Sequence, residues 1–264
     1  MASGPIGSNK ALMDAMKAAF PRPHVFADLF EEREFRKFRL AQALRIFGNH
    51  GFDDGIAGHI TVRDPIDTDA FWVNPFPESG PRHLLNIAAF MIHSKIHAAR
   101  PDVICAAHSH SVYAKAFGAL GRELDMISQD ACAFYNDCAL YTEHHRIAFQ
   151  ESEGDVIAKA LGSKKAAILQ IFLIPQNHGA IVVTNSVEAS IHYYIQLELA
   201  CHIQLLADSA AAARGEQTVK ITPEQAQKTF GTLSNPTPLG WFGGLVKFEL
   251  LERQEGKRFE FRRK

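Results

Sequence analysis

Three histidines in two short motifs have the types and spacing best suited to chemistry in this 264-residue chain. His108 and His110 flank a serine at the end of the apolar run 103–107, and His178 precedes a glycine and another apolar run. Because side chains alternate along a strand, residues i and i+2 point to the same side. A strand edge at His178 would bring a third imidazole beside that pair. Three neutral imidazoles with an open fourth position are typical of a catalytic metal site. The spacing alone does not exclude that the motif arose by chance, because the chain contains 13 histidines.

The hydrophobic pattern predicts the strands and helices that would position these histidines. The predicted helices cover residues 31–50, 84–99, 112–120, 156–161 and 186–212. The predicted strands cover 58–63, 70–74, 103–107, 166–173 and 180–183, with short strands and a loop between 123 and 141. For residues 235–261 the pattern favours turns and a final strand. Strands followed by covering helices predict an α/β fold, in which a central sheet has helices on its faces.

Composition and charge exclude several classes of protein. The formal net charge is -1, and no long basic run precedes the short basic C-terminus. Neither nucleic acid nor an anionic membrane is therefore an expected partner. No apolar stretch approaches the ~18 residues that span a bilayer, and the N-terminus lacks the pattern of a signal peptide. None of the four cysteines forms a C-x-x-C pair. We expect a cytoplasmic protein in a reducing compartment.

Several motifs, taken in order along the chain, resemble the class II aldolase/adducin family. They are the segments 58–63, 99–102, 108–110 and 177–179. The resemblance covers roughly residues 35–235. It leaves 1–34 as an N-terminal extension and 236–264 as a C-terminal tail that packs on the domain.

The resemblance has implications for fold, cofactor and assembly. It implies a three-layer α/β/α fold around a central, mainly antiparallel sheet. It implies a divalent metal held by His108, His110 and His178, most often Zn²⁺, with Fe²⁺ as the alternative. It also implies a homotetramer whose active sites lie at subunit interfaces.

Three departures from the family pattern change the expected chemistry. Aldolases of this family place a glutamate, their general base, on the helix before the histidine pair, and the corresponding residue here is Ala89. The glycine loop that holds a sugar phosphate normally has an asparagine where this chain has His59. The family's tyrosine after the pair corresponds to Gln129. Removing a proton from carbon requires a positioned base, so ordinary sugar-phosphate aldol chemistry is not expected. Polarisation of a carbonyl by a metal remains compatible with the three histidines.

Fungal members of the family share these departures, and the segments 72–75, 90–94 and 129–136 resemble them. Some are assigned as decarboxylases in polyketide pathways, including tropolone pathways, whereas other glutamate-less members are iron-dependent oxygenases of aromatic acids. Loss of carbon dioxide needs no base at carbon, because a Lewis acid stabilises the enolate that remains. A proton donor is still required.

Three residues are therefore candidates for binding and proton transfer. His59 and Tyr135 are the candidate catalytic residues, and Gln129 is the candidate substrate-binding residue. Tyr135 fits equally well as a packed aromatic residue whose hydroxyl is hydrogen-bonded.

We therefore predict a metal-dependent carbon–carbon lyase. The favoured activity is decarboxylation of a small aromatic or polyketide-derived carboxylic acid in secondary metabolism. The alternatives are a non-haem iron oxygenase or an aldolase on the same fold, and a non-catalytic adducin-like module. Because imidazole ligands suit both zinc and iron, the sequence leaves the metal open.

Two further features bear on the site. His93 and His97 are four residues apart on a predicted helix, but they lack the glutamate of the H-E-x-x-H pattern. We expect them to pack at the helix surface or at an interface.

The segment 74–85 is shorter than is usual in the family, and 171–176 looks inserted directly before the Asn177-His178-Gly179 motif. That insertion could displace the third ligand.

Overall fold

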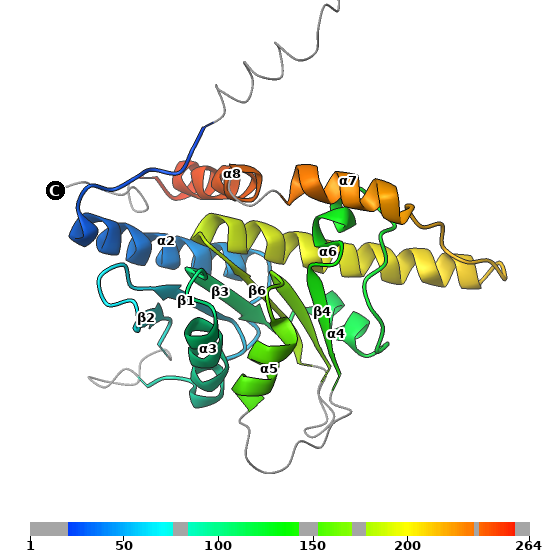
Figure 1. Cartoon of the computed structure of the whole chain (residues 1–264), viewed down its shortest axis with the longest axis horizontal. Coiled ribbons are helices and arrows are strands. Elements are labelled where there is room, and N and C mark those ends of the chain that lie inside the picture. Colours follow the sequence, from blue (N-terminus) through cyan, green and yellow to red (C-terminus); the bar gives the residue numbers. More distant parts are fainter. Residues whose placement is uncertain (1–20, 76–83, 143–152, 171–177, 235–237, 257–264) are drawn as a thin grey trace, which may run out of the picture.

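The computed structural model describes residues 21–75, 84–142, 153–170, 178–234 and 238–256. Its centre is a six-stranded sheet in the order β2-β1-β3-β6-β5-β4 (Figure 1). The strands are β1 (His59–Arg63), β2 (Phe71–Val73), β3 (Cys105–Ser109), β4 (Cys138–Thr142), β5 (Ala166–Gln170) and β6 (Gly179–Thr184). Among these strands β4 and β5 pair in parallel and the other neighbours are antiparallel. The predicted mainly antiparallel sheet is confirmed.

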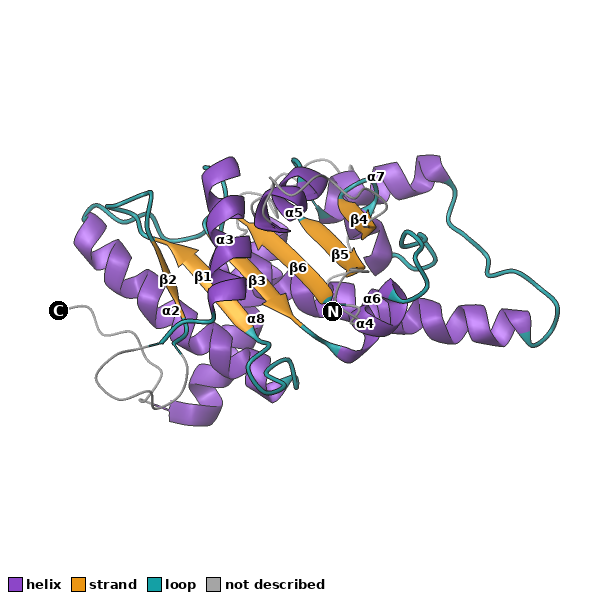
Figure 2. Ribbon diagram, turned by 90° about the horizontal axis from the view of Figure 1, so that it is seen from below, coloured by secondary structure: helices purple, strands orange, loops and turns teal. Residues whose placement is uncertain are grey.

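Helices cover both faces of this sheet (Figures 1 and 2). They are α2 (Leu29–Asn49), α3 (Ile87–Ala99), α4 (Val112–Gly118), α5 (Glu153–Leu161), α6 (Val187–Ala212), α7 (Pro223–Leu233) and α8 (Pro238–Glu255), with the short 3-10 helix η1 (Asp130–Phe134). Helices α3 and α5 pack on one face, whereas α2, α4 and α6 pack on the other. The expected three layers are therefore present, and α8 lies outside α6 (Figure 1).

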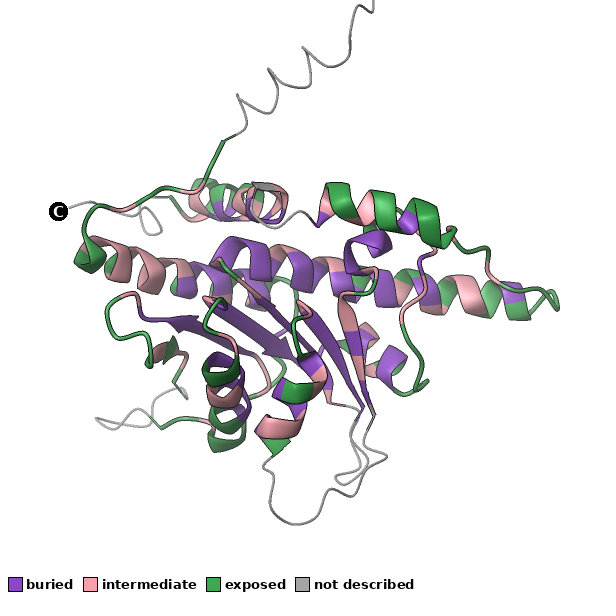
Figure 3. Ribbon diagram, in the orientation of Figure 1, coloured by how far each residue is buried: buried purple, intermediate pink, exposed green. Residues whose placement is uncertain are grey.

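The central strands are buried on both faces, as Figure 3 shows. Every residue of β3 is buried. Cys105 and Ala107 contribute to the core under α2 and α6, and Ala106 contributes to the core under α3 and α5. An uninterrupted apolar run is the usual sequence of a strand covered on both sides. The run before His108 therefore predicts this position correctly.

The C-terminal part contradicts the sequence interpretation. Residues expected to form turns and a final strand instead form α8, which packs against α6. The reason is a cluster of glycines that resembles turn chemistry but serves helix packing. A Cβ on Gly244 would lie 2.0 Å from the carbonyl oxygen of Glu188, and one on Gly243 would lie 2.7 Å from the His192 ring. Glycine here allows close approach of two helices.

Helix boundaries elsewhere follow local capping. Asp28 accepts a hydrogen bond from the Phe30 amide and begins α2, so the helix starts within the expected N-terminal extension. Ser186 caps α6 at the predicted position. Most of the short segment 74–85, namely residues 76–83, and the whole insertion 171–176 lie outside the described residues. Within the described residues, no helix is both long enough and apolar enough to cross a bilayer.

Candidate metal centre

The structure brings His108, His110 and His178 together at one end of the sheet. His108 lies in β3, His110 follows that strand, and His178 immediately precedes β6, which pairs with β3. One ring nitrogen from each histidine lies within 4.8 Å of those of the other two. The ring centroids are 4.7 to 5.3 Å apart. Two strand ends therefore gather the three side chains that the sequence singles out.

Gly179 makes this convergence possible. Its φ of +109° is a conformation that residues with a side chain rarely adopt. A Cβ at this position would lie 2.1 Å from the carbonyl oxygen of Ser109. The backbone at Ser109 thus lies so close to Gly179 that no side chain fits between them. This close approach explains why a glycine follows His178.

Hydrogen bonding determines which nitrogen His108 presents. Its Nδ1 lies 2.9 Å from the carbonyl oxygen of Ala180. Because a carbonyl can only accept, Nδ1 must carry the proton, and Nε2 keeps its lone pair. That lone pair is what a metal ion requires from an imidazole.

Burial keeps all three imidazoles neutral at physiological pH. Burial lowers the pKa of His108 well below its ordinary value, and the neighbouring histidines lower it further. Burial and then His178 lower the pKa of His110 to about 4. The pKa of His178 is also lowered, mainly by burial. Neutral imidazoles bind metals without first losing a proton, so this set of donors fits a divalent ion such as Zn²⁺ or Fe²⁺.

His59 lies beside the three histidines on the neighbouring strand. It is the direct cross-strand partner of His108, and the two rings are nearly parallel with centroids 6.4 Å apart. His59 is buried and also lines a cavity of about 290 Å³. Burial is the largest cause of its lowered pKa. Its place between the three imidazoles and a cavity suits a residue that contacts substrate.

The cavity beside His59 combines apolar walls with a few polar groups. Phe47, Asn74 and Asn86 are among the residues that line it. Asp53 is the one carboxylate among its described lining residues, which include no lysine or arginine. Such walls favour an uncharged portion of a ligand.

His93 and His97 are not at a helix surface, and that expectation is wrong. They are 1% and 4% exposed and lie on the face of α3 that packs against the sheet. The Thr61 hydroxyl lies 2.8 Å from His93 Nδ1 and 2.9 Å from His97 Nε2. His93 also lies beside the site, with its ring centroid 6.5 Å from those of His59 and His108. His93 and His97 therefore form a second group of buried histidines that is hydrogen-bonded to Thr61, and His93 packs beside the candidate metal centre.

Because His93 and His97 are buried, we expect the free energy of unfolding to fall in acid. Burial is the largest cause that lowers the pKa of His93 to about 3 and of His97 to about 4, against 6.5 in the unfolded chain. Below pH 6.5 the unfolded chain binds protons that the folded protein does not bind, so the free energy of unfolding falls as pH falls. At pH 5 each histidine contributes about 2 kcal/mol of this loss. Urea denaturation of metal-free protein at pH 7 and pH 5 measures it.

The matched variant for this measurement is His97→Gln. Its amide can still hydrogen-bond to Thr61 but does not titrate. We expect its stability to change less between the two pH values, by about the contribution of one histidine. Parallel pH profiles for the variant and the unaltered protein would refute this explanation.

Gln129 and Tyr135 lie away from the histidines in this chain. Gln129 is exposed just before η1, and Tyr135 is half-buried just after it. Tyr135 packs against a small apolar cluster that includes Ala200 of α6 and Ala226 of α7. This segment leads into the start of β4, whereas the histidines lie at the other end of the neighbouring strands. Within one chain these two residues do not join the candidate site.

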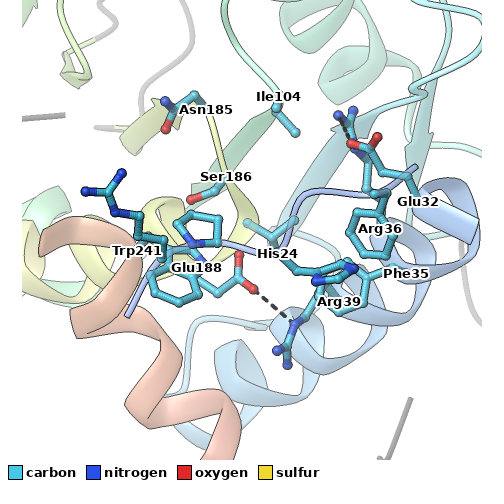
Figure 4. A pocket seen from close by; sticks show the side chains of 14 residues that line it. His24, Glu32, Phe35, Arg36, Arg39, Ile104, Asn185, Ser186, Glu188 and Trp241 are labelled. Atoms are coloured by element: carbon cyan, nitrogen blue, oxygen red, sulfur yellow. Dashed lines mark hydrogen bonds and ion pairs between the residues drawn. The ribbon is translucent and has the colours of Figure 1, made fainter. Parts of the chain in front are cut away.

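A second cavity, of about 360 Å³, lies at the opposite end of the sheet (Figure 4). It is formed by the segment before α2, by α2 itself, by the start of α6 and by Trp241 of α8. Two of its cations are neutralised inside it, because Arg39 pairs with Glu188 at 3.0 Å and Arg36 pairs with Glu32 at 2.6 Å. Because these arginines are already paired, this cavity is a less favourable candidate for a reactive site than the histidine cluster.

Comparisons with known proteins place this geometry in a family. The family model described as class II aldolase and adducin N-terminal domain matches residues 38–79 and 77–205. Decarboxylase NovR from Streptomyces niveus is 37% identical over 243 residues, covering 84% of this chain and 86% of that protein. A 4-hydroxy-3-prenylphenylpyruvate oxygenase/4-hydroxy-3-prenylbenzoate synthase from Streptomyces roseochromogenus is also 37% identical over 243 residues, covering 84% and 83%.

A solved structure agrees with the sequence relatives. The L-fuculose 1-phosphate aldolase from Glaciozyma antarctica superposes with a TM-score of 0.79 at 39% identity, covering 91% of this chain and 97% of that one. The residues matched by the family model contain the whole sheet and all three clustered histidines. The chain therefore belongs to the class II aldolase and adducin family.

Proposed function

We propose that this protein is a metal-dependent carbon–carbon lyase that decarboxylates a small aromatic or polyketide-derived acid in secondary metabolism. The observation that supports it most is the convergence of three neutral imidazoles next to His59, which lines a cavity, on a helix-covered sheet whose α3 has no carboxylate. The position of the family's glutamate, Ala89, is buried on α3 one turn before His93. The similarity to Decarboxylase NovR supports the same reaction class.

The reaction needs an electron sink and a proton, and no base at carbon. The bond between the carboxylate carbon and its neighbour breaks, carbon dioxide leaves, and the electron pair stays on the remaining fragment as an enolate. A divalent ion held by His108, His110 and His178 would supply Lewis acidity towards the oxygen of that enolate. A proton from a donor then completes the product. Ala89 is compatible with this sequence of steps, whereas aldol chemistry requires the missing base.

His59 is the proposed catalytic residue of this chain. With its pKa lowered, it is neutral at physiological pH and carries one N–H. That N–H can donate a hydrogen bond to a substrate oxygen and can pass a proton from solvent. The neighbouring cavity would take the uncharged part of the substrate, because its described lining residues include no cation to pair with a phosphate.

Gln129 and Tyr135 require a different explanation if they act in catalysis. Because both lie away from the histidines of their own chain, they would reach a metal centre only in a neighbouring copy. We propose that the protein is a homotetramer in which Tyr135 donates a proton, and Gln129 binds substrate, across a subunit interface.

Two other activities have a specific observation in their favour. A relative named as an oxygenase supports iron-dependent oxidation of an aromatic acid. A solved relative described as an aldolase supports aldol cleavage. An adducin-like scaffold without catalysis has less support, since the three histidines converge.

One assay separates these activities. Full-length protein, loaded with Zn²⁺ or anaerobically with Fe²⁺, is incubated separately with aromatic 3-oxo acids, whose decarboxylation leaves an enolate, with aromatic 2-oxo acids and with a sugar phosphate. Carbon dioxide, dissolved oxygen and released aldehyde are measured together. We expect carbon dioxide release without oxygen consumption. Stoichiometric oxygen consumption only with iron would establish the oxygenase, and aldehyde release from a sugar phosphate would establish the aldolase.

A further inference from the structure

A carboxylate of α5 lies beside the candidate metal centre, although α3 provides none. Glu153 is the first residue of α5, and its Oε1 lies 3.8 Å from Nδ1 of His178. We propose that Glu153 is a positioning residue: it accepts the Nδ1–H of His178 and so directs the Nε2 of that imidazole towards the metal. This inference rests on the proposed metal site.

The first support is the state of the His178 ring. Its Nδ1 is buried and has no hydrogen-bond partner. A buried polar nitrogen without a partner is unusual and costly. The separation from Glu153 exceeds an ordinary hydrogen bond by about 1 Å, which a change of glutamate side-chain rotamer can close. The Glu153 side chain is 42% exposed, so it has room to make that change.

The second support is the way α5 is fixed against α3. Gly154 follows Glu153, and a Cβ there would lie 2.4 Å from the carbonyl oxygen of Met91. The two helices therefore touch at the residue next to Glu153. One turn along α3, Lys95 forms an ion pair of 2.9 Å with Asp155. These contacts hold the first turn of α5, and hence the Glu153 backbone, beside the site.

The third support is the parallel with His108. That imidazole already donates its Nδ1–H to a protein acceptor, the carbonyl oxygen of Ala180. The same arrangement at His178 would present Nε2 from both rings. Acceptors behind metal-bound histidines fix ring orientation and raise the basicity of the ligand. A carboxylate would also offset part of the positive charge that a divalent ion brings to three neutral ligands.

Metal affinity tests this role without reference to activity. Metal-free full-length protein is titrated with Zn²⁺ in competition with a chromophoric chelator. We expect Glu153→Ala to weaken the Kd for Zn²⁺ about 10- to 100-fold. Glu153→Gln keeps the volume and an acceptor oxygen but loses the charge, so its Kd should fall between those of the wild type and Glu153→Ala. The matched control, Glu224→Ala, removes an exposed glutamate from the first turn of α7, a helix away from the histidines, and should bind Zn²⁺ as the wild type does.

A second readout follows the proton itself. In the Zn²⁺-loaded protein, the Nδ1–H of His178 should give a low-field proton resonance coupled to a histidine nitrogen, and Glu153→Ala should lose it. Thermal melts of the metal-free variants establish that each is folded. If Glu153→Ala and Glu153→Gln both bind Zn²⁺ as tightly as the wild type, the role of Glu153 is refuted while the metal site stands. If the wild type binds no Zn²⁺, the proposed metal site itself fails.

Discussion

Replacement of His108 with alanine is expected to abolish metal binding by the purified protein, together with every activity that depends on the metal. His108 is 3% exposed, its ring centroid lies 5.3 Å from that of His110 and 5.1 Å from that of His178, and its Nδ1 is fixed by Ala180. The variant leaves two imidazoles, whereas catalytic sites of this kind use three protein ligands. Elemental mass spectrometry of the variant and the decarboxylation assay measure the two effects.

The control for this variant is His202→Ala. His202 stacks on Tyr113 with ring centroids 3.6 Å apart and is not one of the three histidines whose ligand atoms converge. We expect this control to keep both metal and activity. A His108→Ala protein that retains a full complement of metal would mean that the ion binds elsewhere.

A methyl group at Gly179 is expected to disrupt the fold at the metal centre. Alanine would place its Cβ 2.1 Å from the Ser109 carbonyl oxygen, and its φ of +109° is unfavourable for any side chain. The ends of β3 and β6 would have to separate, which moves His178 away from His108. We expect Gly179→Ala to lower the free energy of unfolding by about 3 kcal/mol or more and to abolish metal binding. Urea denaturation and metal analysis measure both.

Gly215 provides the matched comparison for this substitution. It also has a positive φ, +69°, but a Cβ there would meet no atom within 4 Å. Gly215→Ala therefore reports the conformational penalty alone, about 1 kcal/mol, and should leave the metal in place. Equal stability losses for the two variants would show that the close approach at Gly179 is not important.

The sequence predicts those parts of the site that depend on local periodicity. The alternation expected of an extended chain places His108, in β3, and His110, just after it, on one side, and the apolar runs around them predict two buried strands. The long helical pattern over 186–212 predicts α6 to within one residue of its observed limits. These signals are local, so they can be read from the sequence without knowing the fold.

Other parts of the site depend on packing between segments that are distant in sequence. In the sequence, the glycines of α8 indicate a turn. Their role in helix packing becomes clear only from the position of the Glu188 backbone opposite them. His93 and His97 share a helix face with Ile92 and Ile96. That apolar spacing is a signal that could have placed them inside. The approach of Glu153 to His178 has no local signal, because it follows from the contact between α5 and α3.

The metal content of the protein, purified with no metal added, tests the central claim most directly. Elemental mass spectrometry of the full-length chain gives the number and identity of bound ions. The three-histidine centre predicts about one zinc or iron ion per chain. A correctly folded protein that contains no divalent metal, and takes up none when Zn²⁺ or Fe²⁺ is supplied, would contradict the metal-dependent lyase proposed for this chain.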